Sequence, residues 1–126
     1  MPTSRLDVIC VVEDDAAVRN ALKFALEMER LNVRAYDGPV SLLSDPNLPP
    51  FSCLIVDYRM PVMDGLELVA ALRQRGVVAP AILITGKADG HLRDRAGKLG
   101  IWHILEKPLA DETLIEAIRS AQRSGR

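Results

Sequence analysis

The sequence predicts an α/β fold in which a parallel sheet is covered by helices on both faces. Three observations support this fold. Strand-like and helix-like segments alternate five times along the chain. Residues 8–12 are apolar without alternation, as in a strand that is buried on both faces. Charged residues follow three of the strand-like segments, and open α/β sheets bind their ligands at the carboxyl ends of their strands.

The pattern of apolar residues and turn residues divides the chain into alternating elements. In chain order we expect a strand at 7–12, a helix at 16–29, a strand at 32–36, a short helix at 40–43, a strand at 51–56, a helix at 66–76, a strand at 80–84, a helix at 88–99, a strand at 101–105 and a helix at 111–122.

The first half of the chain supplies three of the strands. Asp15 can cap the helix that follows the first strand, in which apolar residues repeat at intervals of three and four. Residues 32–36 are short and mixed in character, which favours the edge of the sheet. A loop at 45–50, rich in proline, leads to the third strand. Residues 51–56 of that strand are mostly apolar and run into Asp57.

The second half begins with a turn at 61–65, and the helix after it should end near Gly76. The next strand is closed by Thr85. The helix at 88–99 has few large apolar residues and two glycines. Each interior glycine costs about 1 kcal/mol relative to alanine, so we expect this helix to be locally soft. We expect residues 123–126 to form a frayed tail.

Length and composition fit a single domain. The chain has 126 residues, of which 48% are hydrophobic, so we expect one domain over residues 1–126 with an ordinary core. The net charge of −1 gives no bulk positive field, and we expect no direct contact with nucleic acid. No segment approaches the roughly 20 apolar residues of a membrane span, and the amino terminus does not resemble a signal peptide. The sequence therefore predicts a cytoplasmic protein without a membrane partner.

Acidic residues follow two of the apolar strands. Glu13 and Asp14 come after the first strand, and Asp57 follows the third. Since the carboxyl ends of parallel strands meet at one edge, these carboxylates should lie close together. At about 6 Å each pair would repel by roughly 3 kcal/mol at an effective dielectric constant near 20. Such a site raises a pKa or binds a cation, and a ligand set made only of oxygens favours Mg²⁺.

A lysine and a threonine complete this edge of the sheet. Lys107 follows the last strand and brings a positive charge, and Thr85 brings a hydroxyl group. The backbone N–H groups of Arg59 and Gly86 can donate from their turns. Together these groups can neutralise the oxygens of a phosphoryl group. Asp57 would then be the carboxylate nucleophile that forms an acyl phosphate.

Four motifs at the strand ends resemble those of a known family. In order they are Glu13-Asp14-Asp15, Val56-Asp57-Tyr58-Arg59-Met60-Pro61, Ile84-Thr85-Gly86 and Glu106-Lys107-Pro108. Together they resemble the receiver domain of two-component response regulators, over about residues 6–122. The resemblance implies a flavodoxin-like, doubly wound fold with five parallel strands in the order 2-1-3-4-5 and five helices on both faces. The turn residues further resemble the subgroup that feeds transcription regulators needed for nitrogen fixation.

The resemblance also implies roles for the site residues. It implies that Asp57 accepts a phosphoryl group from the phosphohistidine of a sensor histidine kinase or phosphotransfer protein, and that the chain is a phosphoacceptor and not a turnover enzyme. The implied ligands of Mg²⁺ are Asp14, Asp57, the backbone carbonyl of Arg59 and, through water, Glu13. The implied phosphate contacts are Lys107 and Thr85. The resemblance also implies a cis peptide bond between Lys107 and Pro108.

One position departs from the family pattern. Three residues before the lysine, receivers commonly carry an aromatic ring that swings inward when the threonine turns toward the phosphate, but this chain has Ile104. Trp102 lies on the same face by strand alternation and could replace part of that surface. Arg59 and Lys87 flank the expected phosphate entrance, and in this family these positions tune the lifetime of the acyl phosphate.

Other functions use the same residue types. A phosphatase of the haloacid dehalogenase type also has a strand-end aspartate, Mg²⁺ and a lysine, but it needs a second aspartate where this chain has Arg59. A degenerate receiver would keep the fold as a docking module and never accept phosphate. A lone strand-end aspartate is more often a cap or turn residue, but the neighbouring motifs favour a nucleophile for Asp57. Thr85 could also cap the weak helix.

The remaining candidates receive structural roles. Asp15 should favour the start of the first helix. His91 and His103 have no partner acids in the sequence, so we expect solvated or packing side chains. Cys10 and Cys53 lie inside predicted strands, where we expect reduced core residues.

The output of the domain leaves two alternatives open. The sequence favours a stand-alone regulator that works by protein contacts, and the alternative is a piece of a longer protein. Phosphorylation adds about −1.5 to −2 charges, and we expect it to repack the helix at 88–99 and the face that this helix forms with the last strand and the last helix. That face, near Trp102, Ile104 and Leu109, is also the candidate surface for a homodimer.

Overall fold

The structure is a computed structural model that describes residues 8–124, in which strands and helices alternate throughout. The strands are β1 (Val8–Val12), β2 (Asn32–Tyr36), β3 (Cys53–Asp57), β4 (Ala81–Thr85) and β5 (Ile101–Glu106). The helices are α1 (Ala16–Met28), α2 (Pro39–Leu43), α3 (Gly65–Gln74), α4 (Gly90–Lys98) and α5 (Asp111–Ser124). Every predicted element is therefore confirmed in type and order. The predicted start of the first strand at residue 7 and the predicted tail at 125–126 lie outside the described residues.

The strands form one parallel sheet in the order β2-β1-β3-β4-β5, which confirms the predicted topology. All residues of β3 and β4 are buried, and β1 is buried from Ile9 to Val12. The mixed strand β2 lies at an edge, as its sequence predicted. Val12 pairs with Val56, and Asp57 pairs with Ile84. The carboxyl ends of the inner strands are therefore level with one another.

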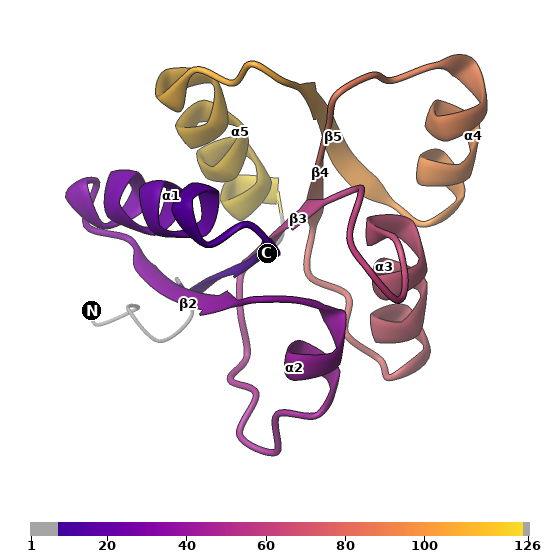
Figure 1. Ribbon diagram of the computed structural model, residues 1–126, viewed down its shortest axis with the longest axis horizontal. Coiled ribbons are helices and arrows are strands. Elements are labelled where there is room, and N and C mark those ends of the chain that lie inside the picture. The colour runs from indigo at the N-terminus through magenta and orange to yellow at the C-terminus, as the bar shows by residue number, and fades with distance from the viewer. Residues whose placement is uncertain (1–7, 125–126) are drawn as a thin grey trace.

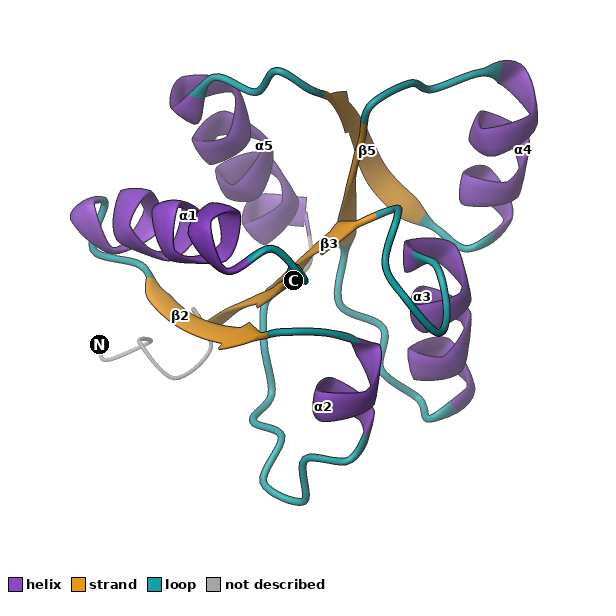
Figure 2. Ribbon diagram, in the orientation of Figure 1, coloured by secondary structure: helices purple, strands orange, loops and turns teal. Residues whose placement is uncertain are grey.

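Helices cover both faces of the sheet. Figures 1 and 2 show α1 and α5 on one face and α2, α3 and α4 on the other. Each face has its own hydrophobic core, because successive residues of β3 point to opposite sides: Leu54 belongs to one core and Ile55 to the other. None of the helices within residues 8–124 is both long and apolar enough to cross a membrane.

The ends of the helices follow from their caps. The Asp15 side chain accepts a hydrogen bond from the Val18 N–H at 3.1 Å, which confirms its predicted structural role at the start of α1. Asp89, and not Thr85, caps α4. The helix therefore begins at Gly90, two residues later than the predicted start at residue 88.

The frayed tail predicted from residue 123 is wrong for residues 123–124, because α5 continues to Ser124. Asp111 and Glu112 lie in the first turn of α5, and Arg123 lies in its last turn. Acidic residues at the start and a basic residue at the end complement the dipole of the helix. This charge pattern favours the additional helical residues.

The strand β5 departs from strict alternation. Ala81 pairs with Ile101, but Ile82 pairs with His103, so Trp102 is passed over by a shift of register. Trp102 is 40% exposed, whereas Ile104 packs against the core on the α4 side. The alternation from which we expected Trp102 and Ile104 to share one surface is therefore interrupted at Trp102.

Candidate functional site

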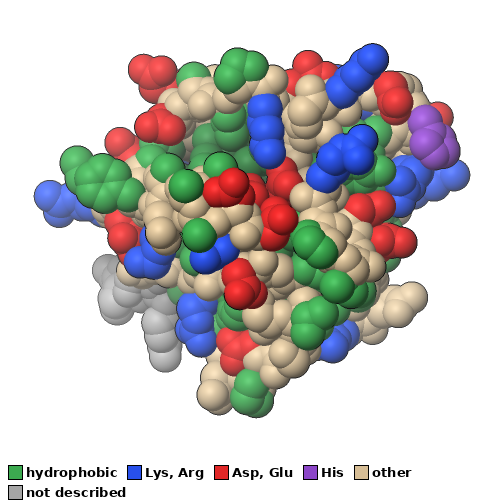
Figure 3. Space-filling view, in the orientation of Figure 1, with side chains coloured by type: hydrophobic (Ala, Val, Ile, Leu, Met, Phe, Trp, Pro, Cys, Tyr) green, Lys and Arg blue, Asp and Glu red, His purple; other side chains and the backbone are tan. Residues whose placement is uncertain are grey.

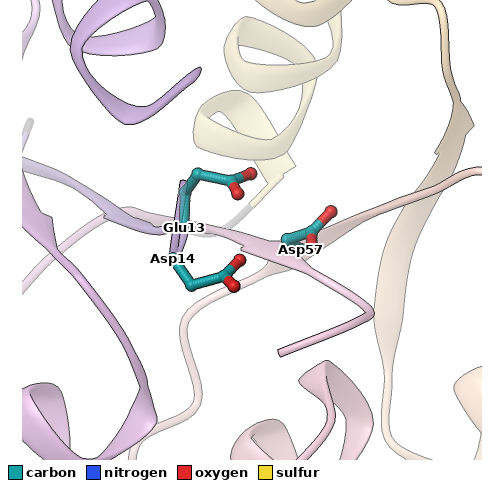
Figure 4. A group of neighbouring side chains, drawn as sticks. All are labelled: Glu13, Asp14 and Asp57. Carbon is teal, nitrogen blue, oxygen red and sulfur yellow. The ribbon is translucent and has the colours of Figure 1, made fainter. Parts of the chain in front are cut away.

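Three carboxylates meet at the carboxyl edge of the sheet. Asp57 is the last residue of β3, and Glu13 and Asp14 directly follow the neighbouring strand β1. One oxygen of each carboxylate lies within 4.8 Å of the other two. Figure 4 shows the side chains of Glu13 and Asp14 projecting toward Asp57. The structure thus brings together the acidic residues that the strand ends predicted.

The site collects the buried polar side chains of the domain. Within the described residues, the buried polar or charged side chains are those of Glu13, Asp57 and Thr85, which are 4%, 5% and 4% exposed. Asp14 is exposed, so the cluster opens to solvent on that side. Figure 3 shows acidic side chains gathered near the centre of this face, with basic side chains close by. Burial of so much negative charge is costly unless cations compensate it.

The segment after β1 is held by hydrogen bonds that fix Glu13. The Glu13 N–H donates to the Tyr36 carbonyl at 3.1 Å, and the Arg19 side chain donates to the Glu13 carbonyl at 2.9 Å. The Glu13 carboxylate accepts from the Asp15 N–H at 3.1 Å. Burial raises the pKa of Glu13, and the negative charges of Asp57 and Asp14 raise it further, against the Asp15 N–H and Lys107. The site therefore resists the charged form of Glu13.

Lys107 supplies the positive charge. Its Nζ lies 2.9 Å from Oδ1 of Asp57, and its backbone N–H donates to the Thr85 carbonyl at 2.9 Å. The hydrogen bond to Asp57 raises the pKa of Lys107, so the lysine stays protonated at neutral pH. The Lys107–Pro108 peptide bond is cis, as the resemblance implied. One lysine faces three carboxylates, and the cluster therefore keeps an excess of negative charge.

Thr85 lies at the end of β4 with its hydroxyl turned into the next loop. The hydroxyl donates to the Lys87 carbonyl at 3.2 Å and accepts from the Lys87 N–H at 3.3 Å. The cap of α4 is the Asp89 side chain, which accepts from the Leu92 N–H at 2.9 Å. The alternative role of Thr85 as a helix cap is therefore wrong. Its hydroxyl is beside the site but engaged with the loop.

The loop that follows Asp57 returns tightly against the sheet. The Tyr58 N–H donates to the Ile84 carbonyl and the Gly65 N–H donates to the Tyr58 carbonyl, both at 2.8 Å. A Cβ atom on Gly65 would lie 2.7 Å from the Asp57 carbonyl oxygen, so this return requires glycine. Arg59 lies in the loop with an exposed side chain.

An open groove separates this loop from the start of α4. The groove has a volume of about 390 Å³, and Arg59, Lys87 and His91 are among its lining residues. Arg59 and Lys87 thus border one opening beside the site, in line with the predicted entrance.

Within residues 8–124, the carboxylate cluster includes no histidine or cysteine. His91 is exposed, and the His103 ring lies edge-on to Trp102 with centroids 6.0 Å apart. Cys10 and Cys53 are buried and free, and burial raises the pKa of both thiols to about 12. Both cysteines are therefore free core residues, as predicted, and their raised pKa disfavours the reactive thiolate.

Sequence reasoning missed the contacts that tie α4 to this site. The Arg95 guanidinium donates to the Tyr58 hydroxyl at 3.2 Å and lies 3.7 Å from the Asp64 carboxylate. The Ala88 N–H donates to the Glu106 carboxylate at 2.8 Å. Tyr58 follows the strand-end aspartate and Glu106 precedes the site lysine. Arginines are so common in polar helices that no sequence signal marked Arg95, which is half-buried in the structure.

Comparison with known proteins identifies the family. The model of the response regulator receiver domain matches residues 9–119. The transcriptional regulatory protein FixJ of Bradyrhizobium diazoefficiens is 36% identical over 115 residues, which are 91% of this chain and 56% of that protein. The response regulator protein TodT of Pseudomonas putida is 35% identical over 119 residues, which are 94% of this chain and 52% of that protein. The chain thus spans about half the length of the curated relatives it matches.

Solved structures agree with this assignment. The crystal structure titled FixJ-N superposes with a TM-score of 0.81 at 33% identity, covering 92% of this chain and 93% of that one. The chemotaxis protein CheY4 of Vibrio cholerae gives a TM-score of 0.86 at 23% identity, covering 92% and 98%, and supports the fold alone. With its strand order, its acidic cluster and its relatives, the chain belongs to the family of response regulator receiver domains.

Proposed function

We propose that Asp57 accepts a phosphoryl group from the phosphohistidine of a sensor histidine kinase or phosphotransfer protein, in a Mg²⁺-dependent reaction in the cytoplasm. Phosphorylation by a sensor kinase is the general function of the receiver family, to which the chain belongs. One observation supports Asp57 as the acceptor: it is a buried carboxylate 2.9 Å from the Lys107 ammonium and within 4.8 Å of two further carboxylates.

The donor set fits Mg²⁺. Receiver domains generally bind this ion at an acidic pocket, and the cluster offers carboxylate oxygens, which hard cations prefer. The proposed ligands are Asp14, Asp57, the Arg59 carbonyl and, through water, Glu13. Since Lys107 offsets only one of three carboxylates, the site has a reason to bind a divalent cation. When bound, Mg²⁺ would neutralise this charge and the charge of the incoming phosphoryl oxygens.

The proposed transfer forms one bond and breaks one. A carboxylate oxygen of Asp57 attacks the phosphorus, the P–N bond of the phosphohistidine breaks, and its electron pair stays on the imidazole nitrogen. Lys107 now donates to Asp57 and can turn one of its N–H groups to a phosphoryl oxygen. Thr85 can donate there only after its hydroxyl leaves the Lys87 carbonyl. Phosphate contact by Thr85 would therefore release its hydrogen bonds to Lys87 in the loop before α4.

The chain is proposed to be a phosphoacceptor that promotes its own phosphorylation and dephosphorylation. The phosphoryl group stays on the protein, so no outside substrate is turned over. A phosphatase of the haloacid dehalogenase type would need an acid/base group two residues after the nucleophile. That residue is Arg59, which has no carboxyl group.

We further propose that residues 1–126 act as one receiver domain and pass the signal on by protein contacts, without touching nucleic acid. The face of α4, β5 and α5 is the proposed surface for a homodimer, because it carries the exposed Trp102 at the edge of the sheet. Sedimentation with and without a phosphate mimic tests this. A monomer in both conditions would remove the dimer.

Intact-mass spectrometry after incubation with acetyl phosphate and Mg²⁺ tests the function. We expect a mass gain of one phosphoryl group, which is lost in Asp57→Asn and in EDTA. Asp15→Asn is a matched control, because asparagine also caps helices. No gain under any condition would favour a docking module. Continuous release of phosphate far beyond one equivalent would instead indicate a phosphatase.

A further inference from the structure

One arginine of α4 contacts both ends of the loop after Asp57. Nη1 of Arg95 donates to the Tyr58 hydroxyl at 3.2 Å, and Nη2 lies 3.7 Å from Oδ2 of Asp64. Tyr58 is the first residue after β3, and Asp64 is the last residue before α3. The loop between them contains Arg59, whose carbonyl is a proposed metal ligand. The position of Arg95 thus bears on the geometry of the whole loop.

Asp64 divides its carboxylate between two helices. Its Oδ1 accepts from the Glu67 N–H at 2.8 Å, and the Glu67 side chain accepts from the Asp64 N–H at 2.8 Å. This capping box fixes the start of α3. Oδ2 is the oxygen that faces Arg95. The loop is therefore anchored to α3 at its end and linked to α4 by one guanidinium.

The helix α4 has few other anchors. Its buried residues are Leu92 and Ala96, and its sequence contains two glycines. The segment before it is held by the hydrogen bond from the Ala88 N–H to Glu106, next to the site lysine. Polar contacts thus connect α4 to the end of β3, and the segment before α4 to the end of β5. A helix with so little buried apolar surface moves at low cost.

Tyr58 can carry the coupling that Ile104 cannot. Ile104 is aliphatic and has no polar atom with which to follow a change at the site. The Tyr58 side chain packs against the same core as Leu92 and Ala96, and its hydroxyl contacts Arg95. The groove of about 390 Å³ between the loop and α4 borders Tyr58 and Thr85 and leaves room for a shift.

We propose that Arg95 is a positioning residue that holds the loop after Asp57 and, through Tyr58, couples the phosphorylation site to α4. The inference rests on the proposed phosphorylation of Asp57. When the loop adjusts to the phosphoryl group, Tyr58 and Asp64 move relative to α4 and Arg95 transmits the change. Because coupling between two sites is reciprocal, a protein that binds and displaces α4 would also change the Mg²⁺ affinity of the carboxylate cluster.

Two variants and a matched control separate coupling from folding. Arg95→Met removes the guanidinium with little change in helix propensity, and Tyr58→Phe removes only the hydroxyl. Arg93→Met is the control, because Arg93 is an exposed residue of the same helix. Each protein is incubated with acetyl phosphate and Mg²⁺ and followed by intact mass. Hydrogen exchange of the α4 amides is compared before and after phosphorylation, and Mg²⁺ affinity is measured by calorimetry.

We expect phosphorylation to change the exchange of α4 in the wild type and in Arg93→Met. In Arg95→Met and Tyr58→Phe the same phosphoryl mass should appear, but the change in exchange should fall by about fivefold or more. The Mg²⁺ affinity should fall in Arg95→Met and not in Arg93→Met. If Arg95→Met does not fold, Tyr58→Phe decides alone.

Equal changes in exchange in all four proteins would overturn the coupling. A phosphorylated wild type whose α4 exchange does not change would overturn it too, while leaving the proposed function intact. A wild type that gains no phosphoryl mass would refute the proposed function, and the coupling with it.

Discussion

Val62 is held in a backbone conformation that valine rarely adopts. Its φ is 79°, and the Met63 N–H donates to the Pro61 carbonyl at 2.9 Å, so Val62 is the central residue of a tight turn. Left-handed backbone costs an L-residue about 1–2 kcal/mol, and a β-branched residue there is an outlier. Val62 is 82% exposed, so burial of its side chain offsets little of this cost.

Replacement of Val62 by glycine should therefore stabilise the protein. The variant removes a backbone strain of about 1–2 kcal/mol from the folded state. It also costs about 0.5–1 kcal/mol, since glycine loses more conformational freedom on folding than valine does. The net gain in the free energy of unfolding lies between about 0 and 1.5 kcal/mol, with a central value of roughly 0.75 kcal/mol. With an m-value of about 1.5 kcal/mol per M, the central value raises the midpoint in urea by roughly 0.5 M.

Val78→Gly is the matched control for this prediction. Val78 is also 82% exposed and lies in a connecting segment, but its φ is not positive. Glycine brings only its entropy cost there, so the control should lose about 0.5–1 kcal/mol. The two variants should thus shift the urea midpoint in opposite directions with unchanged m-values. A midpoint that falls in Val62→Gly as it does in Val78→Gly would refute the strain argument.

Three further predictions concern the site. Glu13→Gln should raise the urea midpoint at neutral pH. Burial raises the pKa of Glu13 above 4.5, so the stability that Glu13 contributes is present below about pH 4.5 and is lost as the pH rises through the folded-state pKa. The variant lacks this titrating group, so the stability should depend less on pH than in the wild type. Mg²⁺ at about 100 times its dissociation constant should stabilise the wild type by about 2.7 kcal/mol, and clearly less in Asp57→Asn; equal stabilisation would argue against the cluster as the binding site. Gly65→Ala should lower the free energy of unfolding by about 1–3 kcal/mol and slow phosphorylation, because its Cβ would lie 2.7 Å from the Asp57 carbonyl oxygen. Gly97→Ala is the control: a Cβ there meets no atom within 4 Å, and the variant should be tolerated. Equal urea midpoints in these two alanine variants would contradict the close approach.

The parts of the site that topology dictates could be read from the sequence. Residues that follow parallel strands must meet at one edge, so recognising the apolar strands was sufficient to bring Glu13, Asp14, Asp57 and Lys107 together. The cap at Asp15 was equally local. These predictions needed only a parallel sheet and the position of each residue relative to its strand end, whereas the strand order was implied by the family resemblance.

Features that depend on a single register or on a long-range pair could not be read in this way. A shift by one residue in β5 interrupts the alternation on which the position of Trp102 was predicted. The contact of Arg95 with Tyr58 joins residues 37 positions apart, and many exposed arginines fit the same sequence pattern. The positive φ of Val62 belongs to the loop that returns to Gly65. Local propensity alone would not place valine there.

The charges of the site indicate why its rest state and its phosphorylated state differ. Three carboxylates and one lysine leave a formal excess of two negative charges, which one divalent cation would balance. Under the proposed function, phosphorylation replaces the single charge of Asp57 by about −1.5 to −2 and restores an excess. The Thr85 hydroxyl is a buried donor at the end of the neighbouring strand, and it donates to the Lys87 carbonyl. The added charge would favour rotation of that hydroxyl toward the site, and this would free the loop that leads into α4. Two loops would then act on the weakly anchored helix α4. The loop after Asp57 would act through Arg95, and the loop before α4 would act through the amino-terminal end of the helix.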